Sequence, residues 1–214
     1  HHSVTAALRH AEKLLKDGAH ILDIGGESTR PGSPAVPLEE EMRRVLPFVQ
    51  AAVQFGVPIS VDTYKAQVMQ AVLDAGADII NDVWALRQPG AQSVVASHPQ
   101  CGVVLMHMHK TPPDMQQTPM QGDAVAQVQN FLAQQTQALL ALGVERQRIV
   151  WDYGIGFGKT VAQNFALLAH QAALTRQGFA LLAGWSRKSS LGQVTNLSVE
   201  ERMVPSVAAA VLAV

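Results

Sequence analysis

The stretch that decides the fold is Gly18–Asp23 (GAHILD), and Gly76–Asn81 (GADIIN) repeats its pattern further along the chain. Each begins with a glycine after a helical pattern, continues as an apolar run and ends on a polar residue. Asp62 and Asp152 end two further apolar runs, and Ser186–Ser189 (SRKS) follows another. Near-continuous apolar runs are typical of parallel strands that are covered on both faces. The sequence therefore predicts repeated strand–helix units whose polar strand ends meet on one face of the molecule.

Six strands are expected, each followed by a helix. The expected strands end near residue 23 or span residues 58–62, 78–81, 103–107, 148–152 and 179–185, and the expected helices span residues 4–15, 38–54, 65–75, 89–97, 123–142, 163–176 and 199–214. This pattern predicts an α/β fold, a (β/α)8 TIM barrel that is partial here, with six recognisable strands. Because no linker or shift in composition divides the chain, residues 1–214 are interpreted as one domain.

The composition excludes several classes of protein. The chain has 214 residues, of which 48% are hydrophobic, and its 16 basic and 17 acidic residues give a net charge of -1. With charges so evenly balanced, neither nucleic acid nor a membrane is an expected partner. The single cysteine, Cys101, excludes an internal disulfide and fits a cytoplasmic protein. No apolar stretch has transmembrane length.

Two strand-end carboxylates, Asp62 and Asp152, are candidates for ligand binding. A buried carboxylate needs a donor partner, and an amino group beside a ring N–H would satisfy it through two hydrogen bonds, as a guanidinium does. The alternative is that each aspartate caps the following helix, which is a favoured role for this residue type. Asn81 at an equivalent strand end favours the ligand interpretation.

The glycine-rich segment Gly154–Thr160 (GIGFGKT) fits neither common nucleotide-binding pattern. A P-loop needs glycine where Tyr153 stands, and the dinucleotide fingerprint needs glycine where Lys159 stands. We expect the loop to let the backbone approach a flat ligand closely, with Phe157 as a wall. The alternative is a plain tight turn.

Two basic segments are candidate anion sites. Ser186–Ser189 lies between a strand and a helix, where backbone amides, two cations and two hydroxyls can bind an anion. Arg30 offers a further cation on a loop stiffened by Pro31, and arginine suits planar anion recognition. The alternative for Ser186–Ser189 is a solvated charged turn.

The pair His107 and His109 alternates along a strand, so that both imidazoles would face one side. A zinc site needs a third close ligand, and the nearby candidates, His98 and Asp114, have unconvincing spacing. Metal binding by these histidines is therefore not expected. Met106 is interpreted as a pocket wall or core residue.

Six ordered motifs together resemble the bacterial dihydropteroate synthases along the whole chain. They are Ile21–Gly32 (ILDIGGESTRPG), Ile59–Thr63 (ISVDT), Ile79–Val83 (IINDV), Leu105–Met108 (LMHM), Gly154–Lys159 (GIGFGK) and Ser186–Ser189 (SRKS). Because six motifs in this order rarely co-occur by chance, the resemblance is highly specific.

The resemblance implies a transferase of folate biosynthesis built on a (β/α)8 barrel. Its reaction would join p-aminobenzoate to 6-hydroxymethyl-7,8-dihydropterin diphosphate, giving 7,8-dihydropteroate and pyrophosphate, with Mg2+ assisting. A homodimer is expected, with sulfonamides as competitors of p-aminobenzoate. The task of such an enzyme is to position two substrates and to stabilise the departing diphosphate.

The resemblance also implies roles for individual residues. Asp62, Asn81, Asp152 and Lys188 would hold the pterin, Met106 would line its pocket with Asp23 nearby, Arg30 would contact the diphosphate, and Thr29, Pro31, Phe157 and Ser189 would shape the p-aminobenzoate site. The residues expected to take part in catalysis are Asp62, Asp152, Lys188 and Arg30. No metal ligand is expected in this chain, because the asparagine that serves the family lies in a first strand not found here.

The sequence departs from the family pattern in three ways. The family's first strand and its last, which carries an Arg–His pair, are not found, so the domain is interpreted as truncated at both ends. Tyr153 stands where the family has proline, and its added N–H and freer φ are expected to shift Asp152 or crowd the pterin pocket. His109 and Lys110 replace the usual Gln-Gly.

Two alternative functions remain open. A methyltetrahydrofolate-dependent methyltransferase domain that serves a corrinoid has no diphosphate to bind, and Thr29–Pro31 and Ser186–Lys188 therefore count against it. A catalytically silent pterin-binding remnant would fit the absent strands and Tyr153. Because this barrel hosts many functions, the fold alone does not decide among them.

Overall fold

The computed structural model describes residues 3–30, 32–111, 115 and 117–213 of the chain. Six strands within these ranges form one parallel sheet in the order β1-β2-β3-β4-β5-β6. They are β1 (Leu22–Gly25), β2 (Ile59–Asp62), β3 (Ile79–Asp82), β4 (Gly102–Met106), β5 (Ile149–Asp152) and β6 (Ala180–Leu182). The predicted α/β class and six strands are confirmed. Within the described residues β1 and β6 do not pair, so the sheet is an open arc.

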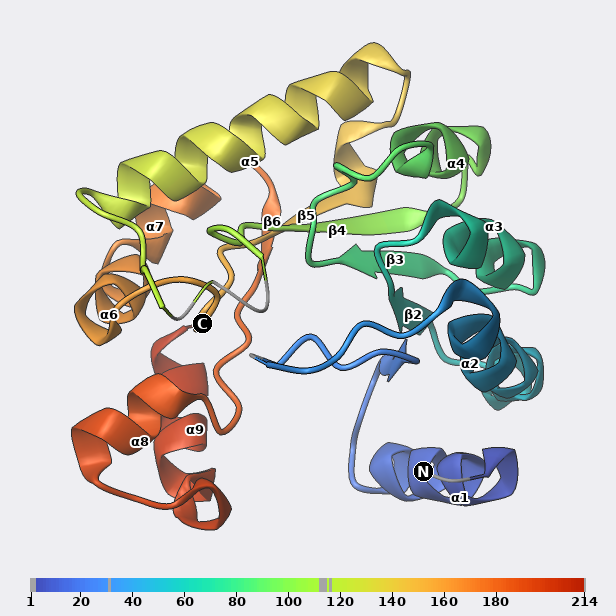
Figure 1. Cartoon of the computed structure of the whole chain (residues 1–214), viewed down its shortest axis with the longest axis horizontal. Helices are drawn as coiled ribbons and strands as arrows, with labels where there is room; N and C mark the ends of the chain where they lie inside the picture. Colours follow the sequence, from blue (N-terminus) through green and yellow to red (C-terminus); the bar gives the residue numbers. More distant parts are fainter. Residues whose placement is uncertain (1–2, 31, 112–114, 116, 214) are drawn as a thin grey trace.

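The helices surround the outer side of this arc (Figure 1). They are α1 (Val4–Lys16), α2 (Leu38–Ala52), α3 (Ala66–Asp74), α4 (Ala91–Ser97), α5 (Ala124–Ala141), α6 (Val161–Ala169), α7 (Gln171–Thr175), α8 (Ser189–Thr195) and α9 (Met203–Leu212), with short 3-10 turns η1 (Val53–Phe55), η2 (Arg146–Arg148) and η3 (Val199–Glu201). Among the helices described, none is both long and apolar enough to cross a bilayer.

Local sequence signals set the ends of several helices. Ser3 caps α1 and Asp123 caps α5, each by accepting a hydrogen bond from a backbone amide of the first turn. Thr160 begins α6 in a reciprocal capping box with Gln163. Gly18 follows α1 with a φ of 102°, a conformation that glycine adopts readily. These signals agree with the helices that the sequence predicts.

Several elements differ from the expectation. The helix predicted at residues 199–214 is divided into η3 and α9. β6 is shorter than the predicted strand at residues 179–185, and the helix predicted at residues 163–176 is divided at His170 into α6 and α7. The sequence did not indicate α8, because this helix is short and contains Gly192, which lowers helix propensity. It ends at Asn196, whose φ is 59°.

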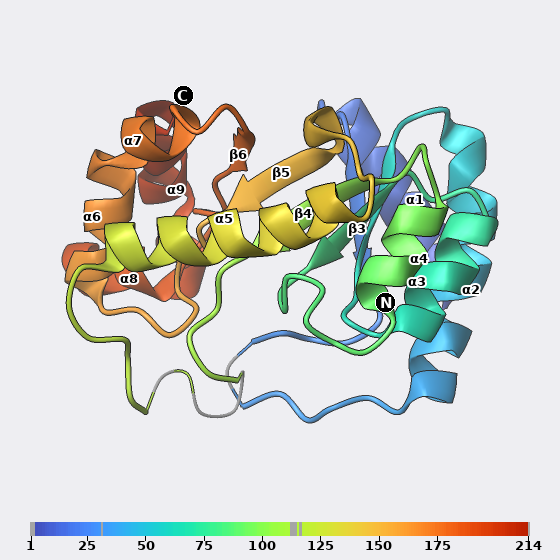
Figure 2. The same cartoon turned by 90° about the horizontal axis from the view of Figure 1, so that it is seen from above.

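The carboxyl ends of the strands carry the two long connections of the fold. Figure 2 shows the described parts of the β1–α2 and β4–α5 connections projecting from the same side of the molecule. We call the described part of the first, residues 26–30 and 32–37, the β1–α2 loop. This arrangement places long loops over the strand ends where the sequence predicts a site.

The hydrophobic core between the sheet and the helices holds the end of β5, where Asp152 stands. Trp151 is 1% exposed and its ring stacks on Phe179, with 4.8 Å between ring centroids. Its indole N–H donates to the hydroxyl of Thr136 in α5 at 2.8 Å. Because Trp151 precedes Asp152, this contact fixes the end of the strand that carries the carboxylate.

Replacing Thr136 by valine tests this anchor. Valine has a similar shape but no acceptor, so the buried indole N–H of Trp151 would be unpaired, at a cost of about 1–3 kcal/mol in the free energy of unfolding. Urea denaturation of the original chain and of T136V measures the loss, and Thr5→Val, at an exposed position of α1, is the control. Equal stability of T136V and T5V would contradict the anchor.

Candidate active site

The parallel register brings predicted site residues together in two pairs. Asp62 of β2 lies beside Asn81 of β3, and Met106 of β4 lies beside Asp152 of β5. The amide nitrogen of Asn81 lies 3.4 Å from both carboxylate oxygens of Asp23, two strands away. Side chains that the sequence spreads over five elements therefore meet at the carboxyl edge of the sheet.

The carboxyl group of Asp62 lies in an unusual electrostatic environment. Burial raises its pKa to about 8, and the neighbouring carboxylates of Asp23, Asp82, Glu41 and Glu27 contribute in decreasing order. No donor among the described residues hydrogen-bonds this carboxyl group. A ligand that brings N–H groups to Asp62 would therefore favour its charged form.

Asp152 is buried next to two cations. Its carboxylate accepts a hydrogen bond from the N–H of Gly154 at 2.7 Å. Burial raises the pKa of Asp152, while this hydrogen bond and the charges of Lys188 and Lys159 oppose the rise. Burial likewise lowers the pKa of Lys188, against the effect of Asp152. The site thus combines a carboxylate and an ammonium group in poorly solvated surroundings.

The alternative interpretation of both aspartates as helix caps is wrong. The residue at the cap position of α3 is Lys65, and α6 is capped by Thr160. Asp62 and Asp152 precede these caps by several residues, in the strands themselves.

Lys159 organises the glycine-rich loop, a role that the sequence pattern did not indicate. The residue is 4% exposed, and Nζ donates to the carbonyl oxygens of His107 (3.1 Å), Gly154 (2.9 Å) and Phe157 (3.2 Å). Burial lowers the pKa of Lys159 to about 7, against the opposing effect of Asp152. The lysine ties the loop after β5 to the exit of β4.

Two of the loop glycines were expected to allow close approach of a ligand, but the structure gives them a different role. Gly154 and Gly158 have φ values of 66° and 70°. A Cβ at Gly154 would lie 2.0 Å from the carbonyl oxygen of His107, and one at Gly158 would lie 2.6 Å from that of His109. These glycines therefore allow the loop to pack against the chain's own backbone.

A small apolar cluster accompanies the polar residues. It consists of Val83, Met106, Met108 and Met115, with Trp84 and Phe157 packed against them. The Nζ of Lys188 lies 4.7 Å from the centroid of the Phe157 ring. The two predicted wall residues, Met106 and Phe157, thus belong to one apolar surface that adjoins Lys188.

The β1–α2 loop borders a small cavity of about 240 Å³. Thr29 lines it together with Tyr64 and Trp84. Arg30 is exposed. Pro31, which was predicted for the same site, lies outside the described residues.

The basic segment after β6 divides into different environments. Lys188 is partly buried beside Phe157, whereas Arg187 is exposed. The backbone N–H of Arg187 donates to the hydroxyl of Ser206 at 2.9 Å. Ser189 is exposed at the first position of α8. Of the predicted cations in this segment, Lys188 is the one that the fold brings to Asp152.

The surroundings of the two histidines after β4 favour their neutral forms. His107 is buried with its ring edge-on to Phe131, and burial lowers its pKa to about 3. Burial and then Lys110 lower the pKa of His109. Within the described part of the chain, no group of three or more His, Cys, Asp or Glu side chains could hold a metal ion. Asp114, a candidate ligand in the sequence, lies outside that part.

Tyr153 packs in the core between sheet and helices. The residue is 0% exposed, belongs to the same core cluster as Trp185, and its hydroxyl donates to Gln171 of α7 at 3.4 Å. The cluster that contains Met106 is a separate one. This placement argues against the expected crowding of the site by the tyrosine.

A larger cavity lies away from the paired residues. It has a volume of about 810 Å³ and lies between α1, β1 and α2. Of the predicted site residues, Asp23 alone lines it. The register and the charges therefore locate the candidate site better than cavity size does.

The chain is similar to known proteins in both sequence and structure. The family described as "Pterin binding enzyme" matches residues 1–214. The dihydropteroate synthase of Escherichia coli K12 is 42% identical over 214 residues, which cover 100% of this chain and 76% of that protein.

Two solved structures are similar to the fold of this chain. The Yersinia pestis dihydropteroate synthase with a sulfonamide drug has a TM-score of 0.96 at 42% identity, covering 100% of this chain and 78% of that one. The Burkholderia cenocepacia dihydropteroate synthase complexed with 7,8-dihydropteroate has a TM-score of 0.89 at 48% identity, covering 99% and 78%.

The pH dependence of stability tests the burial of Lys159. Because its pKa of about 7 lies below the ordinary 10.5, the folded chain binds fewer protons than the unfolded chain between these values. The stability of the original chain relative to Lys159→Met should therefore rise as pH increases through this window. Urea denaturation at both ends of the window measures the difference, with Lys16→Met on α1 as an exposed control. A difference that stays constant or shrinks would contradict the burial.

Proposed function

The chain belongs to the pterin binding enzyme family, and we propose that it acts as a dihydropteroate synthase, the activity named for its relatives. The observation that carries the proposal is the pairing in register of Asp62 with Asn81 and of Met106 with Asp152, beside Lys188. The reaction would join 6-hydroxymethyl-7,8-dihydropterin diphosphate to p-aminobenzoate, with 7,8-dihydropteroate and pyrophosphate as products.

The pterin would bind at the paired residues. Asp62 and Asp152 offer acceptor oxygens to the amino group and ring N–H of the pterin, in the manner of a carboxylate that binds a guanidinium. Asn81 supplies both a donor and an acceptor. Met106 offers an apolar surface to the flat ring, and Lys188 a donor on the side of Asp152.

The second substrate and the diphosphate would be held by the loops. Arg30, which is exposed on the β1–α2 loop, is proposed to contact the diphosphate. The p-aminobenzoate site is proposed to lie among Thr29, Phe157 and Ser189, together with Pro31. Sulfonamides would compete there, and a sulfonamide drug is bound in the Yersinia pestis structure.

The chemistry requires no nucleophile from the protein. The amino nitrogen of p-aminobenzoate forms a bond with the exocyclic methylene carbon of the pterin, while the C–O bond to the diphosphate breaks. The electron pair of that bond leaves with pyrophosphate, and the attacking nitrogen loses a proton to solvent. Asp62 and Asp152 would stabilise the positive charge that develops on the pterin, which favours an SN1-like path.

Magnesium is the proposed cofactor, and we propose that it enters with the diphosphate. The described residues bring together no metal-binding group of three His, Cys, Asp or Glu side chains, so they do not form a cage for the ion. Mg2+ commonly binds through substrate phosphates and keeps several waters. Its contribution would be to neutralise charge on the diphosphate.

A homodimer in the cytoplasm completes the proposal. Its support is the outer surface of α9, where Met203, Val204, Val207, Val211 and Leu212 are 58–75% exposed. Large exposed apolar patches are typical of protein interfaces and of other binding surfaces. The single cysteine agrees with a reducing compartment.

Pyrophosphate release tests the proposed function directly. The purified chain would be supplied with p-aminobenzoate, the dihydropterin diphosphate and Mg2+, and the expected result is release that depends on all three. A corrinoid methyltransferase domain would bind methyltetrahydrofolate in preference to the diphosphate. Tight pterin binding without pyrophosphate release would instead favour the silent pterin-binding protein.

The role of Asp152 leads to a second prediction. If its carboxylate stabilises charge that develops as the C–O bond breaks, Asp152→Asn should lower turnover on the order of 100-fold. Affinity for p-aminobenzoate, measured by calorimetry, should change by less than about threefold, because the amide leaves the loops in place. Equal losses in turnover and affinity would count against the role.

The pKa of Asp62 sets an expected pH profile. Asp62 accepts two N–H groups of the pterin only as the carboxylate, and its charged fraction rises as pH passes through about 8. The kcat/KM for the pterin substrate should therefore increase with pH over this range and then level off. In Asp62→Asn the increase should be lost. An unchanged profile in this variant would assign the titration to another group.

A further inference from the structure

A partly buried lysine outside the proposed pterin contacts links three elements at the exit of β2. Lys65 immediately precedes α3, its side chain is 16% exposed, and Nζ pairs with Glu27 of the β1–α2 loop at 2.5 Å and with Glu41 of α2. Glu41 is 1% exposed and also accepts a hydrogen bond from the hydroxyl of Thr63 at 2.7 Å. The hydroxyl of Tyr64 donates to Glu27 at 3.1 Å.

The lysine keeps two carboxylates close together. Burial lowers the pKa of Lys65, but its hydrogen bonds with Glu27 and Glu41 outweigh this effect and raise the pKa above its ordinary value. Removing the charged partner from a buried ion pair leaves an uncompensated charge. Without Lys65, the two glutamates would repel each other across the space between the loop and α2.

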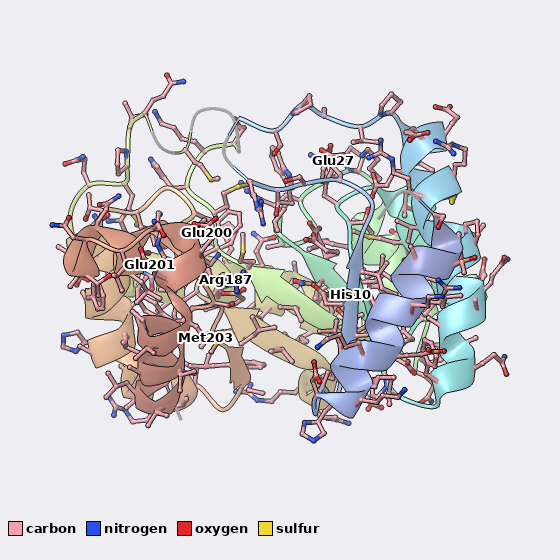
Figure 3. All side chains as sticks on the ribbon, turned by 90° about the horizontal axis from the view of Figure 1, so that it is seen from below. His10, Glu27, Arg187, Glu200, Glu201 and Met203 are labelled. Carbon is pink, nitrogen blue, oxygen red and sulfur yellow. The ribbon has the colours of Figure 1, made fainter. Side chains whose placement is uncertain are left out.

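The base of the β1–α2 loop is packed tightly against α2. A Cβ at Gly26 would lie 2.6 Å from Cγ2 of Val45 and 2.8 Å from Cγ of Glu41. The carbonyl oxygen of Gly26 accepts a hydrogen bond from Arg44 at 2.9 Å. The next residue, Glu27, lies on the side of the molecule that carries the long loops (Figure 3). The loop therefore starts from a fixed base.

Beyond Glu27 the described part of the loop forms hydrogen bonds within itself. The hydroxyl of Ser33 donates to that of Ser28 at 3.0 Å, and the N–H of Ser33 donates to the carbonyl of Arg30 at 3.1 Å. Thr29 and Arg30 lie within this turn. The turn directly follows Glu27 and is connected to α2 at its other end, so the position of its first residues depends on where Glu27 is held.

We propose that Lys65 is a positioning residue for transfer to p-aminobenzoate, because by joining Glu27 to Glu41 it holds the loop with Thr29 and Arg30 over the strand ends. The inference rests on the proposed function. Its consequence is selective. Apart from Lys188, which precedes α8, the proposed pterin contacts come from the strands, so loss of Lys65 should impair use of the second substrate and the diphosphate more than binding of the pterin ring.

The test compares three variants of the full chain. Lys65→Met removes the charge and keeps the length of the side chain, whereas Lys65→Arg keeps the charge and both pairings. Lys13→Met is the matched control, since Lys13 pairs with Asp17 on α1, where their side chains are 70% and 57% exposed. Pyrophosphate release gives kcat and KM, and calorimetry with 6-hydroxymethylpterin gives the affinity for the pterin ring.

The expected result is a loss that Lys65→Arg largely restores. Lys65→Met should lower kcat/KM for p-aminobenzoate on the order of 10-fold to 100-fold, as expected when a positioning contact is lost. Pterin affinity should stay within about threefold, and Lys13→Met should match the original chain. The proposal is overturned if Lys65→Met leaves kcat/KM unchanged, or if pterin affinity falls in the same proportion.

Hydrogen–deuterium exchange provides an arm that does not depend on turnover. In Lys65→Met the amides of residues 26–30 should exchange faster than in the original chain, while in Lys65→Arg and Lys13→Met they should not. Should Lys65→Met fold poorly, Glu27→Gln, which weakens the same pairing from the loop side, takes its place. If the original chain binds pterin but releases no pyrophosphate, the proposed function fails, and this exchange arm alone decides the role of Lys65. Unchanged exchange at residues 26–30 would refute it.

Discussion

Parallel pairing in register between neighbouring strands is the constraint on which the site depends. The register places Asp62 beside Asn81 and Asp152 beside Met106. A slip of one residue would turn each of these side chains to the opposite face of the sheet. The buried contact of Trp151 with Thr136 helps to hold β5 where Asp152 belongs. The same register therefore determines which side chains pack in the core on the outer side of the sheet and which polar side chains gather at its carboxyl edge.

Burial of charge distinguishes this edge from an ordinary polar surface. Asp62 and Asp152 have pKa values raised by burial, and Lys159 and Lys188 have pKa values lowered by it. A buried charged group lowers the stability of the folded chain unless it is paired within the protein or by a bound ligand. Lys159 is satisfied by backbone carbonyls, whereas Asp62 has no donor among the described residues. The carboxyl group of Asp62 is thus the group that a ligand would complete.

Much of the fold could be predicted from the sequence, because strand ends and helix caps are local signals. Asp62, Asn81 and Asp152 stand directly after apolar runs, and Ser3 and Gly18 mark the ends of α1. Contacts between segments that are distant in the sequence have no such local signal. The three carbonyls that Lys159 binds, and the bridge that Lys65 makes between α2 and the β1–α2 loop, depend on tertiary placement.

The lack of a local signal for tertiary contacts also explains why the role of the glycine-rich loop was predicted incompletely. The glycines of Gly154–Lys159 were expected to let a flat ligand approach, but Gly154 and Gly158 are needed because the loop crosses the backbone at the exit of β4. A pattern of glycines reports close approach without saying what approaches. The short helix α8 was not predicted, because its few residues show too little helical periodicity in the sequence.

Proton release on pterin binding tests the central claim most directly. If the pterin pairs with the carboxylate of Asp62, whose pKa in the free chain is raised to about 8, binding near neutral pH must displace the proton that Asp62 carries. Calorimetry with 6-hydroxymethylpterin in buffers of different ionisation enthalpy should then detect release of about one proton per pterin, and none in Asp62→Asn. Binding without proton release, or with the same release in Asp62→Asn, would contradict the account.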